Sequence, residues 1–495
     1  MSVVSAPLAQ RVGSALTWKA VQLAGTKGIF LVRTLVLARL LSPDDFGLLA
    51  IATVAVGVLM SITDLGMTPA LVHQPGLEEA HYNSAWTVNV TRALVVSGAL
   101  IVAAPAISAL FAEPRAADIL RFLALKPLID SGASIKVAEL VRHLNYRRLA
   151  FVSLPAVAVE TIIAILLAMR FGVWALVAGA LTGALAGVVA SYLLAPHRPR
   201  VVLTSATVRP LIRYGRWIFL TGLVAVSASA LTQVVIARQL GAVELGLYFL
   251  AARLAFLPYE VVSQVVGDVA FPLYARIQDD RTRVARAFRS HLVSVAAFLL
   301  PVYVLLISFA PWLVQDVLGQ RWLGTELVIQ LLACVGIAGL FGDTTGPLFR
   351  GLGHPGWILA IEVIQSTLVI LLLWSLTGRY GVVGAALAWL IAIASSQVVS
   401  FMFARRILQR PLAGSIVPMA VVLLASLAAA LTVLVLRQVV SGVAGLLMAV
   451  AFAGSATAIV LWFCDRRFDL GLRTDVTQAF PQMADLIAFA PATRR

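Results

Sequence analysis

Long apolar stretches follow one another along almost the whole chain, with only a few polar residues between them. Each stretch can cross roughly 30 Å of hydrocarbon as an α-helix that rises about 1.5 Å per residue. The stretches are continuous and lack the alternation of apolar and polar residues that marks a membrane-barrel strand. We therefore predict an all-α polytopic membrane protein with about fourteen transmembrane helices, at residues 17–41, 46–72, 82–111, 116–142, 149–171, 173–195, 210–240, 244–277, 287–317, 323–350, 355–380, 382–409, 412–437 and 441–465.

One phrase of the sequence occurs twice, as LVLARLLSPDDFGLLAIA at residues 35–52 and as VVIARQLGAVELGLYFLA at 234–251. In each copy an apolar run ends in Ala-Arg, and a short turn then leads to a glycine and a second apolar run. Each copy therefore predicts two helices joined by a turn. Because the second copy begins six predicted helices after the first, both copies enter the membrane in the same direction, as parallel repeats do.

Two further echoes support a repeated architecture. Predicted helices 2 and 8 each carry an aspartate followed by a proline that we expect to kink the helix, and predicted helices 6 and 12 open on related phrases. These are Asp64 with Pro69, Asp268 with Pro272, and RFGVWALVAG (170–179) with RYGVVGAALA (379–388). We predict two six-helix lobes around a central cavity, plus two extra C-terminal helices. The expected parts are an N-terminal lobe (1–195), a basic cytoplasmic linker (196–210), a C-terminal lobe (211–410), helices 13 and 14 (411–465) and a cytoplasmic tail (466–495).

Composition and charge agree with a membrane protein and predict its orientation. The chain is 61% hydrophobic and 12% charged, about half the usual charged share of about 25%. Its mean hydropathy is +0.96. If the chain starts inside, arginines gather in the cytoplasmic segments 147–148, 198–216, 281–289, 405–410 and 466–473. The positive-inside rule then places both termini in the cytoplasm. The net charge of +15 is a belt that faces membrane lipid headgroups, and no nucleic-acid partner is expected.

Five segments resemble a known family when they are taken together in order. They are ARLLSPDDFGLLA, SITDLGMTPALV, LVRHLNYRRLAF, ARQLGAVELGLYFLAARLAFLP and RYGVVGAALA. This set is similar to the polysaccharide flippases of the multidrug, oligosaccharidyl-lipid and polysaccharide exporter superfamily. The resemblance implies an alternating-access transporter of the bacterial inner membrane. Its implied substrates are undecaprenyl-pyrophosphate-linked oligosaccharides for exopolysaccharide, capsule or O-antigen, the sugar part of lipopolysaccharide. A polysaccharide polymerase or export machinery is a further implied partner.

Cationic residues lie inside the predicted helices of the first lobe. A charge at mid-membrane costs at least about 2.5 kcal/mol on insertion scales, so each needs a partner, a wet cavity or a function. We predict a positive cavity wall that compensates the pyrophosphate of a substrate in transit. The candidate substrate-binding residues are Lys27, Arg33, Arg92, Lys126, Lys136 and, in predicted helix 8, Arg253.

Several of these charges have a second interpretation. The spacing of Lys126 with Asp130, and of Lys136 with Glu139, also fits ion pairs that only neutralise the predicted helix 116–142. For Arg39 and Arg238, at the ends of their helices, a structural role is favoured over substrate binding.

Carboxylates at membrane depth are candidates for ion coupling or for charge pairing. They are Asp64, Asp130, Glu260 and Asp268. Either they bind and release a proton or a sodium ion, or they pair with cations of the protein. Glu160 and Glu362, early in predicted helices 5 and 11, are expected to pair with cytoplasmic arginines.

Other function classes lack their sequence signals. No GxxxxGK[ST] phosphate loop and no Asp-x-Asp occurs, and the external loops are short, so we predict a transporter and not an enzyme. Cys334 and Cys464 are far apart, and no metal or cofactor site is expected. An ion-coupled drug or metabolite antiporter of the same superfamily is the alternative function. The sequence leaves open whether helices 13 and 14 shape a groove for the lipid tail, contact a polymerase or merely pack.

Overall fold

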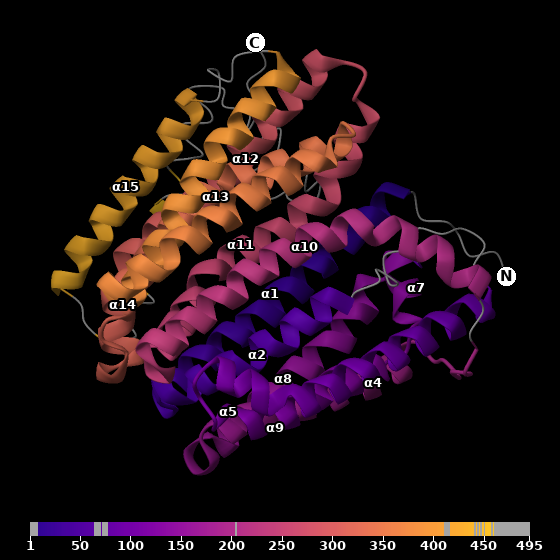
Figure 1. Ribbon diagram of the computed structural model, residues 1–495. Coiled ribbons are helices and arrows are strands. Elements are labelled where there is room, and N and C mark those ends of the chain that lie inside the picture. Colours follow the sequence, from indigo (N-terminus) through magenta and orange to yellow (C-terminus); the bar gives the residue numbers. More distant parts are fainter. Residues whose placement is uncertain are drawn as a thin grey trace. The chain divides into compact units, whose positions relative to one another are not determined.

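The computed structural model describes residues 8–63, 71, 78–202, 205–409 and 416–439, with scattered positions between 442 and 459. The described residues are helices and short connections, without a strand. Eleven helices in this part of the chain are long and apolar enough to cross a membrane. The prediction of an all-α polytopic membrane protein is therefore confirmed. Figure 1 shows the order of the helices along the chain.

The chain packs as two compact units, which are described separately. The first unit comprises Met1–Leu250 and Ile370–Ala385. Its helices are α1 (Leu8–Leu40), α2 (Pro43–Thr63), α4 (Glu79–Leu110), α5 (Ala116–Leu123), α6 (Leu125–Ser131), α7 (Val137–Arg142), α8 (Tyr146–Phe171), α9 (Val173–Leu194), α10 (Ser205–Leu240) and the start of α11 (Ala242–Arg276). Within this unit α8 packs along both α9 and α1, and α2 packs against α10.

The second unit comprises Ala251–Val369 and Ala386–Arg495. It contains most of α11, then α12 (Arg281–Trp312), the π-helix η1 (Leu313–Leu318), the 3₁₀ turn η2 (Gln320–Trp322), α13 (Thr325–Gly351), most of α14 (Pro355–Leu408) and α15 (Ile416–Val439). In this unit α12 packs against α13 and α15. Its core includes the fully buried side chains of Tyr303, Trp312 and Trp322. The division into two six-helix lobes stays a prediction.

Most predicted spans correspond to one observed helix, but residues 116–142 do not form a single span. This segment folds as the three short helices α5, α6 and α7. The break after α6 is bound by polar groups near the end of α9. The Ser134 N–H donates to Ser191 Oγ at 2.9 Å, the Ser134 hydroxyl donates to the Ala195 carbonyl at 2.6 Å, and the Tyr192 hydroxyl donates to the Gly132 carbonyl at 3.0 Å. In a continuous helix the backbone groups would bond within the helix. At the break they bond to groups near the end of α9, so they remain satisfied. Predicted helix 14 lies mostly outside the described residues.

Matching glycines reverse the chain at the two related phrases RFGVW and RYGVV. Gly172, between α8 and α9, has φ 54° and ψ −129°. Gly381, inside the long α14, has φ 61° and ψ −146° and separates two helical halves. Residues with a Cβ rarely adopt this conformation, which explains a glycine at both positions. Segments 170–179 and 379–388 are therefore similar in backbone geometry as well as in sequence.

The two copies of the longer phrase touch each other within the first unit. A Cβ added to Gly47 would lie under 3.0 Å from the Ala242 carbonyl oxygen, and one added to Gly246 would lie under 3.0 Å from the Pro43 carbonyl oxygen. Pro43 and Ala242 occupy matching positions in the two copies, so the contact is symmetric. The first turns of α2 and α11 therefore meet backbone to backbone. Only glycine permits this approach, and the two inter-helix turns lie on the same side of the unit.

Candidate functional site

An ion pair lies in the apolar interior of the first unit. Arg33 of α1 pairs with Glu160 in the middle of α8, and these side chains are 11% and 26% exposed. The Arg33 guanidinium also lies over the Phe30 ring, 5.3 Å from its centroid. The expectation that Glu160 pairs with a cytoplasmic arginine is wrong, because the packing of α1 along α8 brings Arg33 to it.

Small residues on α9 let that helix approach α8 at the same level. A Cβ on Gly179 would lie 2.7 Å from the Glu160 carbonyl oxygen, and one on Gly183 would lie 2.6 Å from the Glu160 Cβ. The spacing is that of the G-x-x-x-G motif, which permits close packing of membrane helices. This motif was present in the sequence and would have pointed to the surroundings of Glu160.

The other cations predicted inside the apolar helices of this unit also occupy partly buried positions. Lys27 lies on α1, and Arg92 lies on α4, where its Nη1 donates to the Thr63 carbonyl at 3.3 Å. Among the described residues, the central parts of the apolar helices of the first unit carry Lys27, Arg33 and Arg92 against the single carboxylate of Glu160. The charge of this interior is therefore net positive in the described part of the chain.

Lys126 and Lys136 lie outside the candidate spans, and each has an ion-pair partner. Lys126 Nζ binds Asp130 at 2.6 Å, and both side chains are well exposed on α6. This is the self-neutralising pair that the sequence offered as the alternative to substrate binding. Lys136 pairs with Glu79 at the start of α4. The suggested pairing of Lys136 with Glu139 is wrong, because the break before α7 turns Lys136 toward α4.

A buried histidine accompanies the Lys136–Glu79 pair. His197 follows α9, its side chain is 1% exposed, and its Nδ1 lies 4.0 Å from Glu79 Oε2. Burial lowers the pKa of His197 below the ordinary value; Lys136 acts in the same direction, while Glu79 and Glu139 oppose it. The next residues bind along α4, where the Arg200 N–H donates to Asn83 Oδ1 at 3.1 Å. The start of the predicted linker is therefore attached to the first unit.

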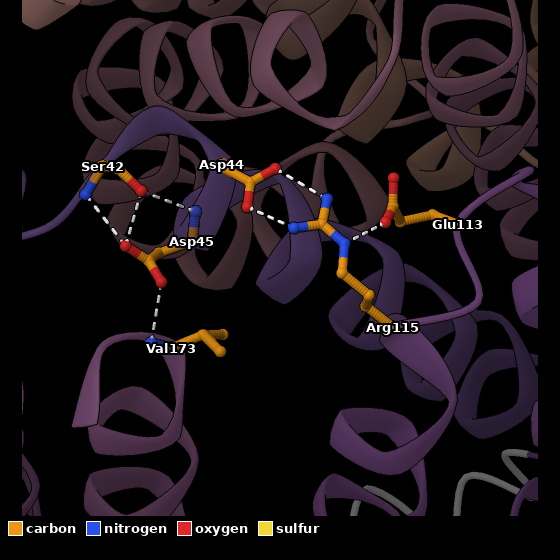
Figure 2. A network of polar contacts seen from close by, with 6 residues as sticks. All are labelled: Ser42, Asp44, Asp45, Glu113, Arg115 and Val173. Carbon is orange, nitrogen blue, oxygen red and sulfur yellow. Dashed lines mark hydrogen bonds and ion pairs between the residues drawn. The ribbon is translucent and has the colours of Figure 1, made fainter.

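A polar network joins three helix ends around the turn between α1 and α2 (Figure 2). Arg115 donates to both carboxylate oxygens of Asp44, at 2.8 and 2.9 Å, and also binds Glu113. The hydrogen bonds that Arg115 donates to Glu113 and Asp44 raise its pKa above the ordinary value. Asp45 accepts from the Ser42 hydroxyl at 2.6 Å and from the Val173 N–H, at the start of α9, at 2.9 Å. Bidentate and charge-assisted bonds of this kind fix the geometry of the turn.

The two arginines of the repeated phrase end α1 and α10. Arg238 Nε donates to the Leu110 carbonyl at the end of α4, at 2.7 Å. Arg39 is exposed near the end of α1. The structural role of both residues stays a prediction.

The candidate residues of α11 and α2 are only partly described. Arg253 is half-buried and Glu260 is exposed on α11. Asp268 and Pro272 lie within α11, but their side chains are outside the described part, and Asp64 and Pro69 lie outside it altogether. The proposed kinks and the proposed ion coupling at these positions stay predictions.

A cavity of about 300 Å³ lies in the second unit, between α11, α13 and both halves of α14. Glu362 lines this cavity, together with glutamines, hydroxyl groups and aromatic rings. Among the described residues Glu362 makes no ion pair, and its expected pairing with a cytoplasmic arginine stays a prediction. Scattered glycines and glutamines gave no signal of this cavity in the sequence.

Comparisons with known proteins identify the family. The family model described as "Polysaccharide biosynthesis protein" matches residues 36–326. The succinoglycan biosynthesis transport protein ExoT of Rhizobium meliloti (strain 1021) is 30% identical over 71% of this chain and 72% of its own. The lipopolysaccharide biosynthesis protein WzxC of Escherichia coli (strain K12) is 24% identical over 82% of this chain and 83% of its own.

Solved structures share the fold at low sequence identity. The lipid II flippase MurJ, in its inward closed conformation, has a TM-score of 0.70 and 16% identity, covering 91% of this chain and 99% of that one. An inward-facing multidrug resistance MATE transporter of the MOP superfamily has a TM-score of 0.64 and 14% identity, covering 80% and 98%. With the family model and relatives of 24–30% identity, these folds confirm the resemblance stated from the sequence. The chain belongs to the polysaccharide biosynthesis protein family.

Proposed function

We propose that this protein is a flippase that carries undecaprenyl-pyrophosphate-linked oligosaccharides across the bacterial inner membrane for exopolysaccharide, capsule or O-antigen assembly. The family, a relative named as a transport protein and the fold shared with a lipid II flippase support this role. The protein would work by alternating access and would supply no bond-making step of its own.

The positive interior of the first unit is the observation that carries the proposal. Lys27, Arg33 and Arg92 outnumber Glu160 among the described charges there. A pyrophosphate is the ligand chemistry that such a surplus suits, since cations replace the hydration that the anion loses inside the membrane.

The contact between Gly47 and Gly246 supports alternating access. The two helix starts meet so closely that nothing passes between them. In the proposed cycle this contact closes one side of the protein and separates when the substrate is released.

An ion-coupled antiporter is the second candidate, favoured by the fold shared with the MATE transporter. The positive interior disfavours cationic drugs as substrates. Coupling to protons or sodium ions through Asp64, Glu260 or Asp268 would serve either function. Asp130 is a weaker candidate for coupling because it already binds Lys126.

Deletion of the gene tests the proposal. A deletion strain should lose its surface polysaccharide and accumulate lipid-linked oligosaccharide on the cytoplasmic leaflet, while its drug susceptibility stays unchanged. A plasmid copy should reverse both effects. Normal surface polysaccharide together with increased drug susceptibility would favour the antiporter.

The proposed orientation, with both termini cytoplasmic, is tested by thiol labelling. Cys334 and Cys464 are first replaced by Ala. A single cysteine at Val243, which is 48% exposed, should react with an impermeant reagent added outside. One at Arg198, exposed after α9, should react only after permeabilisation. The reverse pattern would invert the topology.

A further inference from the structure

The cavity of the second unit has the size of a small ligand site. Its volume of about 300 Å³ lies at the lower end of the range of about 300–1,000 Å³ found for ligand pockets. It equals the liquid volume of roughly ten water molecules, which is far more space than a dehydrated metal ion occupies.

Glycines of α13 make room for the cavity. Gly339, Gly342 and Gly346 lie on its wall. A Cβ on Gly342 would lie 3.1 Å from Gln397 Nε2, whereas one on Gly346 would meet nothing within 4 Å. The cavity is therefore open beside Gly346, and Gln397 borders it beside Gly342.

The polar lining combines one carboxylate with two amides. Gln365 Oε1 accepts from the Ser396 hydroxyl at 3.0 Å, which holds this amide in place. Gln397 Oε1 is buried and has no hydrogen-bond partner among the described residues. A buried polar atom of this kind is normally satisfied, and Gln397 Oε1 can accept a hydrogen bond from a hydroxyl group that enters the cavity. Glu362 adds a second acceptor group to the same wall.

The aromatic lining consists of Phe256, Tyr259, Phe349 and Trp389. Aromatic faces contact the C–H face of a pyranose ring, and amides and carboxylates bond its hydroxyl groups. A cavity with all three kinds of group therefore has the chemistry of a sugar site. Among the described residues of the lining there is no lysine or arginine, so an anion such as pyrophosphate would find no cation on this part of the wall.

We propose that this cavity binds one uncharged sugar residue of the transported glycan. The link to a transported glycan rests on the proposed flippase function, but the binding itself does not. Gln397 and Gln365 bond the sugar hydroxyls, Trp389 contacts the ring, and Glu362 both accepts hydrogen bonds and excludes acidic sugars.

Binding is measured on the purified full-length protein with uncharged methyl glycosides of hexoses and N-acetylhexosamines as probes, by titration calorimetry and by tryptophan fluorescence. Saturable binding of at least one probe at millimolar concentration is expected. Gln397→Leu should weaken it about tenfold, the effect of roughly one hydrogen bond. Gln438→Leu, at an exposed position of α15, is the matched control and should bind as wild type does.

Two conservative changes, Glu362→Gln and Trp389→Phe, test individual roles. Glu362→Gln should allow binding of methyl glucuronide, which wild type rejects, whereas Glu326→Gln at the start of α13 should not. Trp389→Phe should remove most of the fluorescence change while calorimetry still detects binding. A purely structural role of these residues predicts neither result.

Two outcomes would overturn the pocket proposal: no saturable binding of any glycoside by wild type, or equal binding by Gln397→Leu and Gln438→Leu. The proposed function fails separately, if the deletion strain keeps its surface polysaccharide. Glycoside binding that Gln397→Leu weakens would then still establish the sugar site in a protein with another role.

Discussion

Replacing one partner of the Arg33–Glu160 ion pair should lower the free energy of unfolding. Replacing both partners should recover most of the free energy that the single replacement loses. Arg33→Met leaves the Glu160 carboxylate in a mostly apolar environment without its cation. Breaking a buried pair costs about 3–5 kcal/mol. Because the Glu160 side chain is 26% exposed, water recovers part of this, and we expect about 2–3 kcal/mol for the single change. Arg33→Met combined with Glu160→Leu should lie within about 1 kcal/mol of wild type.

The Lys126–Asp130 pair provides a matched control. Its side chains are 36% and 46% exposed and lie on one helix. Exposed pairs at this spacing contribute only about 0.3–0.5 kcal/mol. Lys126→Met, alone or with Asp130→Leu, should therefore leave the thermal midpoint almost unchanged.

The assay measures the thermal unfolding midpoint of the detergent-purified protein. Size-exclusion chromatography detects the fraction that remains folded after heating. A double-mutant cycle gives the coupling between the two residues. The reasoning is refuted if Arg33→Met is as stable as wild type, or if the double variant is no more stable than the single ones.

The same variants separate stability from transport. A stable double variant that no longer exports polysaccharide in the deletion strain would assign Arg33 to anion compensation. Full export would show that the role of Arg33 is structural. Lys27 and Arg92 would then be the remaining candidates for compensating the anion. Arg33→Lys, which keeps the charge but loses the planar fork, should fall between wild type and Arg33→Met in export if phosphate geometry matters.

Three further predictions follow from the first unit. Gly47→Ala would place a methyl group under 3.0 Å from a carbonyl oxygen, so it should increase outside labelling of a cysteine at Val243; Gly57→Ala, whose Cβ meets nothing within 4 Å, is the control and should not. Burial lowers the pKa of His197, so folding stability should fall as pH drops below about 6.5, and His197→Gln should reduce that loss; equal pH profiles would contradict the argument. Gly172→Ala forces a side chain to φ 54° and within 2.9 Å of Asp45 Oδ1, so it should lower the free energy of unfolding by about 1–2 kcal/mol, and an unchanged thermal midpoint would disprove this.

Features that depend on short stretches of sequence were predictable. Apolar length alone places most of the membrane helices, because a helix in lipid satisfies its backbone within its own segment. The reversals at Gly172 and Gly381 follow from one residue type at matching positions. Membership of the family also follows from motifs that are local in the chain.

The tertiary structure decided which distant groups meet. Lys136 binds Glu79 and not its neighbour on α7, and Arg33 binds Glu160 on another helix. The break after α6 depends on acceptors at Ser191 and Ala195. The repeated phrase predicted two similar helical hairpins, but it did not predict that they contact each other at Gly47 and Gly246. Sequence spacing ranks partners within one helix, whereas the strength of an ion pair or hydrogen bond depends on distance and burial, and those are set only when helices pack.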